Sequence, residues 1–247
     1  MALIKCPECG KEVSEYAKAC PNCGCPTEDI IKLKRAQQEQ FLFENTGIGD
    51  IIEFGTYPQG LYGELQAIEW KVLDIDRDKE SILLISKYVL DSGSFNKEWD
   101  SVTWETCSLR KWLNEDFFDK AFTLAEKSKI VETEVLAEKN PEYDTPQGNN
   151  TNDKVFLLSI NEAYKYFKTD AERRCEGTKY SYRRGVCKYD EYGTCFWLLR
   201  SSGQDNKSVA HVSFKGFLYE SGTPVGNIGS LKLFEDKGIR PVIRIKN

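Results

Sequence analysis

Short apolar runs separated by turn residues make up the C-terminal part of the chain. Residues 195–203 read Cys-Phe-Trp-Leu-Leu-Arg-Ser-Ser-Gly, and residues 238–245 read Gly-Ile-Arg-Pro-Val-Ile-Arg-Ile. Such β-branched and aromatic runs are typical of buried strands. Glycines interrupt the sequence between them, which predicts a small antiparallel meander that closes the fold. Because a buried arginine needs a partner, we expect core roles for Trp197, Arg200 and Arg240.

The pattern between residues 51 and 86 predicts three strands that open a large domain. Residues 51–59, 68–74 and 81–86 are rich in β-branched and aromatic residues, and a polar turn separates the second strand from the third. The last two strands should therefore pair as a hairpin.

Two helices are predicted to follow and to pack on this sheet. Apolar residues at helical spacing run through residues 106–117, with Thr106 or Ser108 as the N-cap. A second, short helix begins at a capping box formed by Thr123 and Glu126.

A polar stretch separates these helices from the next predicted elements. Residues 138–154 have the proline, glycine and asparagine content of an exposed loop. A predicted strand at 155–158 follows, and a capping box of Ser159 and Glu162 opens a helix that ends near Phe167.

Residues 172–194 predict an irregular segment in which basic residues alternate with tyrosines. The basic residues are Arg173, Arg174, Arg183, Arg184 and Lys188, and the tyrosines are Tyr180, Tyr182, Tyr189 and Tyr192. Such a mixture can hold phosphates or stack bases. In an acidic protein it is more often a surface segment whose tyrosines lie back on the core, and we prefer this interpretation.

The composition fits one large domain with an appendage. Of 247 residues, 40% are hydrophobic and 12% aromatic, enough to fill a core. The 34 basic residues are dispersed among 39 acidic ones, for a net charge of -5, whereas phosphate binding depends on clustered Lys and Arg. Nucleic acid is therefore disfavoured as the main partner. No apolar run approaches about 18 residues and no signal peptide is visible, so we expect no membrane segment and a cytoplasmic location.

Five of the nine cysteines crowd near the N-terminus, which favours metal ligation over disulfides. Cys6, Cys9, Cys20 and Cys23 form two Cys-x-x-Cys pairs, each followed by glycine, and four such thiolates can close a tetrahedron around Zn²⁺. Structural zinc contributes roughly 10–16 kcal/mol in comparable peptides, so we expect a structural ion without which this module is unfolded. Cys25 falls outside the pair spacing and is expected to be a spare thiol.

Residues 4–26 resemble bacterial zinc ribbons at these four cysteines. Residues 27–47 then predict a helical or flexible linker, because Thr27 suits an N-cap but the apolar residues are too sparse for a continuous face. Those apolar residues are Ile30, Leu33 and Phe41. The expected organisation is a zinc ribbon at 1–26, the linker, and the main domain at 48–247.

Few features of the main domain point to catalysis. The only histidine, His211, lies in an alternating apolar run, so we expect a structural or surface role. Cys175, Cys187 and Cys195 could pair or bind a second metal, but their spacings match no knuckle and buried thiols are common. The sequence has no Gly-x-Gly-x-x-Gly motif, phosphate-binding loop or nucleophile elbow. Carboxylates are plentiful, which keeps a hydrolase open as an alternative.

Residues 51–245 resemble a bacterial domain family of unknown function. The motifs are Phe-Gly-x-Tyr-Pro-Gln at 54–59, Ile-Glu-Trp-x-Val-Leu at 68–73, Leu-Leu-Ile-Ser-Lys at 83–87, Trp-x-x-x-x-Leu-Arg-x-Trp-Leu-Asn at 104–114, Phe-Leu-Leu-Ser at 156–159 and Gly-Ile-Arg-Pro-Val at 238–242. The chain departs from the family at 196–201, Phe-Trp-Leu-Leu-Arg-Ser, where the family has two tryptophans directly before Leu-Arg.

The Trp-Leu-Arg-Ser and Gly-Phe/Val-Arg-Pro signatures of this family, and a two-helix insertion followed by a short glycine-punctuated sheet, are also similar to the C-type-lectin-like fold of formylglycine-generating-enzyme relatives and of retroelement-diversified bacterial proteins. This resemblance implies an α+β fold of short antiparallel strands with two or three helices, in which loops display a ligand surface. No residues match the paired catalytic cysteines of formylglycine-generating enzymes, so their oxidase activity is not implied.

We therefore expect a non-catalytic ligand-binding protein with a structural zinc module, with a retroelement-diversified variable protein as one form of it. A protein or glycan ligand is expected on the surface of residues 203–235 and the loop 172–194, while the zinc ribbon contacts another macromolecule. Polar and aromatic side chains on a rigid sheet suit recognition. The candidate contacts are Gln204, Asn206, His211, Phe214, Phe217 and Tyr219.

Two alternatives stay open. One is an enzyme that is related to formylglycine-generating enzymes, or that acts through carboxylates or through the three cysteines of residues 175–195. The other is a zinc ribbon that contacts nucleic acid or a polymerase, although its lysines are balanced by glutamates.

Overall fold

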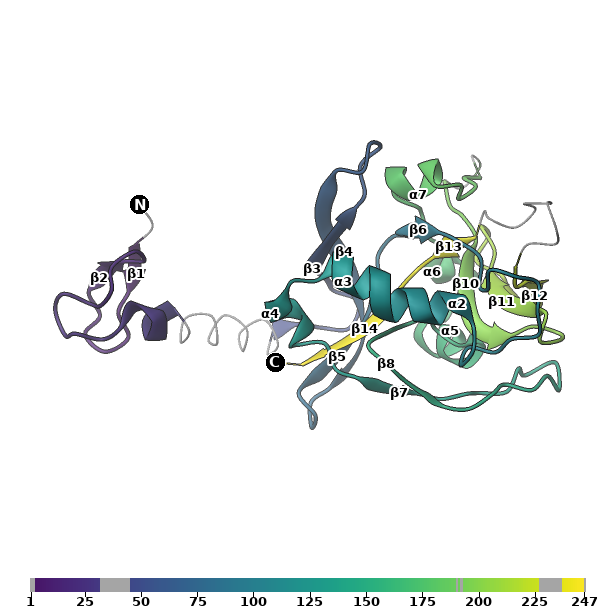
Figure 1. The fold of residues 1–247 in the computed structure, drawn as a ribbon, viewed down its shortest axis with the longest axis horizontal. Coiled ribbons are helices and arrows are strands. Elements are labelled where there is room, and N and C mark those ends of the chain that lie inside the picture. Colours follow the sequence, from purple (N-terminus) through teal and green to yellow (C-terminus); the bar gives the residue numbers. More distant parts are fainter. Residues whose placement is uncertain (1–2, 32–44, 190, 192, 227–236, 247) are drawn as a thin grey trace. The chain divides into compact units, whose positions relative to one another are not determined.

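The chain divides into two compact units, Met1–Gly47 and Ile48–Lys246 (Figure 1). The computed structural model describes residues 3–31, 45–189, 191, 193–226 and 237–246. Most of the predicted linker, at 32–44, and part of the predicted ligand surface, at 227–236, lie outside the described residues, as does Tyr192.

The first unit is a small module around one two-stranded sheet. Strands β1 (Leu3–Lys5) and β2 (Glu12–Ser14) pair antiparallel. Residues 27–31, assigned to the linker from the sequence, form a helical turn. Ile30 in this turn is only 1% exposed because it packs into the small apolar core of the module, which therefore extends past residue 26.

The first sheet of the second unit has five antiparallel strands in the order β3-β4-β5-β14-β9. Their bounds are β3 (Ile51–Pro58), β4 (Leu65–Asp76), β5 (Ser81–Ser86), β9 (Val155–Phe156) and β14 (Val242–Lys246). The predicted hairpin is confirmed in β4 and β5. All six residues of β5 are buried, which explains why its sequence is continuously apolar rather than alternating.

The second sheet follows the order β12-β11-β10-β13-β6. Its strands are β6 (Asp91–Ser92), β10 (Trp197–Ser202), β11 (Ser208–Val212), β12 (Leu218–Pro224) and β13 (Gly238–Ile239). Strands β10 to β12 form the predicted antiparallel meander, and β12 lies at the edge of the sheet. Strand β13 departs from it, because it runs parallel to β10.

Arg240 and Pro241 carry the chain from one sheet to the other. The run 238–245, predicted as one strand, is divided there because proline has no N–H to donate to a ladder. Pro241 O accepts from Ser86 N at 2.9 Å, and Arg240 Nε donates to Ser86 O at 2.9 Å. The guanidinium of Arg240 lies over the Trp197 ring, 5.0 Å from its centroid. Arg240 and Trp197 are both buried, as predicted.

Arg200 is also buried, as predicted, and it has the hydrogen-bond and ion-pair partners that a buried arginine needs. Its Nη1 donates to Leu157 O at 2.8 Å and forms an ion pair with Glu162. The neighbouring Ser201 Oγ accepts from Ile160 N at 3.0 Å. The Leu-Arg-Ser motif therefore holds the helix that begins at Ile160 against β10.

The helices of the second unit are few and short, so the fold is α+β. They begin with α2 (Ser108–Trp112), a π-helix (Leu113–Phe117), α3 (Phe118–Ala121), α4 (Leu124–Lys127) and α5 (Ile160–Tyr166). Both predicted capping boxes, at Thr123 and Ser159, are present. Among the helices that the structure describes, none has the length and hydropathy needed to cross a membrane.

The N-cap of α2 differs from the prediction of Thr106 or Ser108. Cys107 takes this position, and its Sγ accepts from Arg110 N at 3.4 Å. Ser108 cannot serve because its Oγ accepts from Lys97 N at 3.0 Å instead.

The segment 172–194 was predicted to be irregular, but the structure shows two short helices in and beside it. They are α6 (Asp170–Arg173) and α7 (Lys179–Arg183), and each begins at a threonine N-cap. Arg173 is 5% exposed rather than on the surface, because its Nε donates to Gly216 O at 2.8 Å. The basic residues of this segment are thus partly used inside the protein.

The segment 138–154, predicted as an exposed loop, ends in a strand. Strand β8 (Thr151–Asp153) pairs antiparallel with β7 (Thr133–Val135). Asp153 is 2% exposed, and a carboxylate buried this deeply needs several donors.

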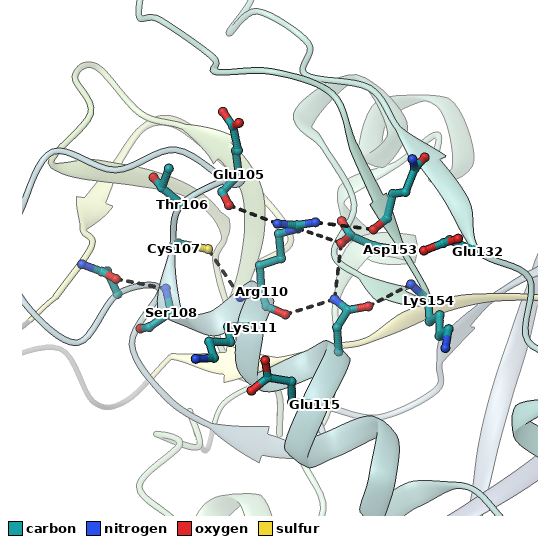
Figure 2. A pocket seen from close by; sticks show the side chains of 13 residues that line it. Glu105, Thr106, Cys107, Ser108, Arg110, Lys111, Glu115, Glu132, Asp153 and Lys154 are labelled. Carbon is teal, nitrogen blue, oxygen red and sulfur yellow. Dashed lines mark hydrogen bonds and ion pairs between the residues drawn. The ribbon is translucent and has the colours of Figure 1, made fainter. Parts of the chain in front are cut away.

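Those donors come mainly from the sequence motif at 104–114. Asp153 accepts from Arg110 Nε at 2.7 Å, as Figure 2 shows. It also accepts from the indole Nε1 of Trp104 at 2.8 Å and from Asn114 Nδ2 at 3.5 Å. Thr151 Oγ1 donates at 2.7 Å. The motif is therefore architectural, since it fixes the start of the helical stretch to the end of the long loop.

Candidate functional site

The four N-terminal cysteines form a tight cluster of potential metal ligands. Their Sγ atoms all lie within 4.8 Å of one another, with Cys6 and Cys23 3.5 Å apart and Cys9 and Cys20 3.6 Å apart. In a regular tetrahedron with Zn–S bonds of about 2.3 Å, the sulfurs lie about 3.8 Å from one another. The geometry therefore fits a tetrahedral metal ion.

Both halves of the cluster have the same backbone conformation. Gly10 N donates to Cys6 O at 2.8 Å, and Gly24 N donates to Cys20 O at 2.8 Å. The two glycines have φ angles of 71° and 80°, which other residues rarely adopt. This explains why each Cys-x-x-Cys pair is followed by glycine.

Cys25 has a backbone role rather than a ligand position. Cys20 N donates to Cys25 O at 2.8 Å, as Cys6 N donates to Lys11 O at 2.9 Å in the other half. Cys25 is therefore the counterpart of Lys11, in agreement with its prediction as a non-ligand.

The thiols of the cluster differ in how easily they ionise. The backbone N–H of Asn22 lowers the pKa of Cys20 to about 6. A backbone N–H of Cys25 favours the Cys23 thiolate, but the neighbouring thiols, led by Cys6, raise the pKa of Cys23 to about 12. Sulfurs this close cannot all carry charge unless a cation neutralises them, which is the situation that a metal ion resolves.

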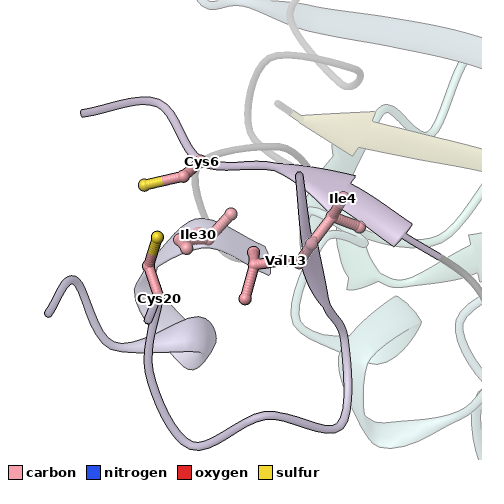
Figure 3. Packing of buried hydrophobic residues seen from close by; sticks show 5 residues of the cluster. All are labelled: Ile4, Cys6, Val13, Cys20 and Ile30. Carbon is pink, nitrogen blue, oxygen red and sulfur yellow. The ribbon is translucent and has the colours of Figure 1, made fainter. Parts of the chain in front are cut away.

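The apolar core of this module is small. It consists of Ile4, Val13 and Ile30 with the buried cysteines Cys6 and Cys20 (Figure 3). Burying three aliphatic side chains contributes only about 5–9 kcal/mol. Domains of this size usually need a metal or disulfides to fold.

The three cysteines predicted as a possible second metal site do not form one. Cys175 and Cys195 are buried neighbours, since Cys195 N donates to Cys175 O at 2.9 Å, while Cys187 is exposed. Across the described parts of the chain, the N-terminal tetrad is the one group of three or more potential ligands. Burial raises the pKa of both the Cys175 and the Cys195 thiol, which disfavours the nucleophilic thiolate.

The six predicted ligand contacts are not equally accessible. Phe217 and Tyr219 are each 45% exposed. His211 is 7% exposed, and its ring stacks on Tyr219 with 5.1 Å between centroids, so it supports the tyrosine rather than facing solvent. Of the others, Gln204 is exposed, whereas Asn206 and Phe214 are half-buried.

Tyr219 lies in an open depression of about 430 Å³ beside β12. Tyr143 is 37% exposed and keeps a large ring surface available there. We call this the β12 depression; its lining residues are Glu142, Tyr143, Leu218, Tyr219, Glu220 and Ser221.

One buried side chain fixes both sides of the β12 depression. Asn140, 6% exposed, donates through Nδ2 to Glu220 O at 2.8 Å and to Ser202 O at 2.9 Å. Its Oδ1 accepts from Glu142 N at 2.9 Å. The hydroxyl of Thr145 donates to Gly203 O at 2.8 Å. The loop that carries Glu142 and Tyr143 is thus held against the sheet.

A larger depression of about 640 Å³ lies beside Asp153 (Figure 2). Its lining mixes acidic and basic side chains, including Glu105, Lys111 and Lys154. Its central Arg110 is already engaged by Asp153 and by Glu105 O at 3.1 Å. The central groups of this depression, Arg110, Asn114 and Asp153, are therefore engaged in holding the fold.

Sequence reasoning missed Glu142 and Tyr143, which lie in the stretch predicted as a solvated loop. An aromatic residue beside an acid in such a loop carries little information by itself. The one feature that could have indicated an ordered loop is Asn140, which precedes a proline. Its hydrogen-bond partners, however, lie 62 and 80 residues away in sequence.

The structure thus defines an α+β domain preceded by a four-cysteine module that could hold a metal ion. The chain belongs to the family described as domain of unknown function DUF6273, whose model matches residues 79–247. The motifs at 54–59 and 68–73 lie before the matched part.

One curated protein also shows a local similarity. An uncharacterized protein of Haemophilus influenzae (strain ATCC 51907 / DSM 11121 / KW20 / Rd) is 62% identical over 24 residues, which cover 10% of this chain and 32% of that protein. The match therefore spans about a third of the relative's length. No solved structure matches the chain.

Proposed function

We propose that this protein is a non-catalytic binding protein whose main domain holds a ligand at the β12 depression. The observation that carries the proposal is a rigidly mounted pair of exposed tyrosines, Tyr143 and Tyr219, on walls that Asn140 joins. Exposed aromatic side chains on a pre-organised surface bind with little entropic cost, so this arrangement suits recognition of a protein or a glycan.

The roles of the motif residues support the same conclusion. Arg110, Asn114, Arg200 and Arg240 all bind backbone or buried acceptors within the fold. A motif with these contacts preserves a scaffold, and the variable chemistry then lies on the loops and edges that the scaffold displays. A C-type-lectin-like fold, in which helices precede a glycine-punctuated meander, agrees with this division and would also suit a retroelement-diversified protein.

For the N-terminal unit we propose a zinc ribbon with a structural role. Four thiolates suit Zn²⁺ best among common ions, and the repeated knuckle backbone supports a closed site with no position left for a substrate. The ion would supply folding free energy rather than chemistry. The module would then be free to contact a second macromolecule in the cytoplasm.

The test is photo-crosslinking with the full chain. A photoreactive amino acid replaces Tyr143, and the matched control carries it in place of Tyr62, which is 80% exposed at a different site. The proposal predicts that a specific ligand crosslinks from position 143, that Tyr219→Ala reduces the yield of this product, and that the ligand is recovered chemically unchanged. Equal crosslinking from position 62, or a ligand converted to a product, contradicts it.

A further inference from the structure

The β12 depression combines aromatic rings with carboxylates. Glu142 and Glu220 both line it, and none of its lining residues is Lys, Arg or His. In the described part of the chain, the Glu142 carboxylate has neither a hydrogen bond nor an ion pair, although its backbone is fixed by Asn140. An acid held in place and left without a cation is available to a ligand of opposite charge.

Tyr164 holds the second carboxylate in position. Its hydroxyl donates to Glu220 Oε1, and Glu220 O is bound by Asn140, so both ends of this residue are anchored. Desolvation, the hydrogen bond to Glu220 and the charge of Glu142 raise the pKa of Tyr164 to about 12, although Arg173 acts in the opposite direction. Both carboxylates therefore lie near the exposed tyrosine rings.

The tyrosine surface next to the depression already binds a cation within the protein. The guanidinium of Arg173 lies over the Tyr164 ring, 5.4 Å from its centroid. Tyr219 has one face stacked on His211, and its remaining exposed surface faces solvent. Ring faces of this kind attract Lys and Arg side chains, and adjacent carboxylates strengthen the contact.

We propose that the β12 depression binds an arginine or lysine side chain of a partner protein. The cation would lie against Tyr143 and Tyr219, with Glu142 and Glu220 accepting its N–H groups. The aromatic faces supply contact area, and the two carboxylates select the charge. This inference rests on the proposed function and narrows its ligand to a basic segment of a protein, in preference to a neutral glycan.

Calorimetry on the full chain tests this with a defined probe, an acetylated hexapeptide of alternating arginine and glycine. Its glutamate-for-arginine analogue and a neutral tetrasaccharide serve as competitors. We expect the basic peptide alone to bind. Glu142→Gln and Glu220→Gln should each weaken binding about five- to tenfold, since each removes one charge-assisted contact and keeps the side-chain shape. Tyr219→Ala should weaken it by about fivefold.

Two matched control variants distinguish binding of the basic peptide at the β12 depression from its unspecific attraction to a protein of negative net charge. Glu53→Gln removes one exposed charge elsewhere, and Tyr62→Ala removes an exposed ring elsewhere. Both should change the affinity by less than about twofold. Absence of binding, or an equal loss in Glu53→Gln, overturns the inference.

The tetrasaccharide could bind instead, in a way that Tyr219→Ala abolishes and Glu142→Gln leaves unchanged. That result would refute the proposal of a basic ligand, but it would agree with the proposed function. If Tyr219→Ala affects neither probe and crosslinking at position 143 also fails, the proposed function fails as well.

Discussion

Removal of the proposed zinc ion from the N-terminal module should unfold that module and leave the second unit folded. Its three buried aliphatic side chains contribute about 5–9 kcal/mol, whereas structural zinc contributes roughly 10–16 kcal/mol in comparable peptides. A chelator therefore removes the greater part of the stabilising free energy of the module. The second unit has its own extensive core, and the tetrad belongs to the first unit, so the free energy of unfolding of the second unit should change by less than about 0.5 kcal/mol.

The chain allows each unit to be followed separately. All five tryptophans, Trp70, Trp99, Trp104, Trp112 and Trp197, lie in the second unit, so tryptophan fluorescence in urea reports on that unit alone. The module carries exposed lysines at Lys11 and Lys18, where trypsin should cut only after metal removal. Mass spectrometry of the fragments then gives the state of the module.

Cysteine variants provide the matched control. Cys20→Ser removes a ligand, so it should lower the affinity for zinc by more than the roughly 10–100-fold that loss of an outer-shell partner costs. It should also unfold the module, so that trypsin cuts after Lys11. Cys25→Ser should bind one zinc ion per chain like the unaltered protein. A module that resists trypsin without metal, or a Cys25→Ser variant that loses the ion, would refute the reasoning.

Three further predictions concern the second unit. Asp153→Ala should destabilise it by about 2–4 kcal/mol in urea titrations, because Arg110 and its other donors lose their acceptor, and Asp153→Asn should cost clearly less. Gly55→Ala should destabilise the fold by at least about 2 kcal/mol, because the φ of Gly55 is 72° and a Cβ there would lie 2.7 Å from a backbone oxygen. Gly49→Ala, with φ 94° and open space around it, should destabilise the fold by only about 1 kcal/mol. Equal losses of stability for the two variants in thermal denaturation would contradict this. Partial desolvation and Glu220 raise the pKa of Tyr164 to about 12, so in ¹³C NMR Tyr164 should titrate after tyrosines with the ordinary pKa of ~10. Its neutral form stabilises the fold below pH ~10, and this contribution is lost as the pH rises toward 12. Glu220→Gln should lower the pH at which Tyr164 titrates.

Local patterns were sufficient to predict the long strands, the two capping boxes and the cysteine tetrad, but not the short strand β8. The β4–β5 hairpin and the capping boxes depend on neighbours within a few residues, and the tetrad depends on a fixed ligand spacing. In each of these features, the residues that contact one another are close together in the sequence, so their spacing is enough to predict the contact. The burial of Arg200 and Arg240 was also predictable, because apolar residues on both sides of an arginine carry it into the core, whereas Arg173, which lies among polar residues, was assigned to the surface.

The β12 depression was only half predictable for the opposite reason. Tyr219 lies on a recognisable strand, but Tyr143 is brought to it by Asn140, whose bonds reach across 62 and 80 residues. Asp153 was likewise assigned to a solvated loop, since polar residues near glycine and asparagine usually face water. Only the fold brings Trp104 and Arg110 to it. Polar residues that tie loops to a sheet look like loop residues in the sequence.

The location of the bound ligand decides whether the β12 depression is the binding site. Hydrogen–deuterium exchange of the full chain, with and without the basic peptide, reports which backbone segments the ligand covers. We expect slower exchange at residues 140–143 and 218–221, with no change at 105–115 beside Asp153. Protection confined to 105–115, or to the buried Cys175 and Cys195, would contradict it.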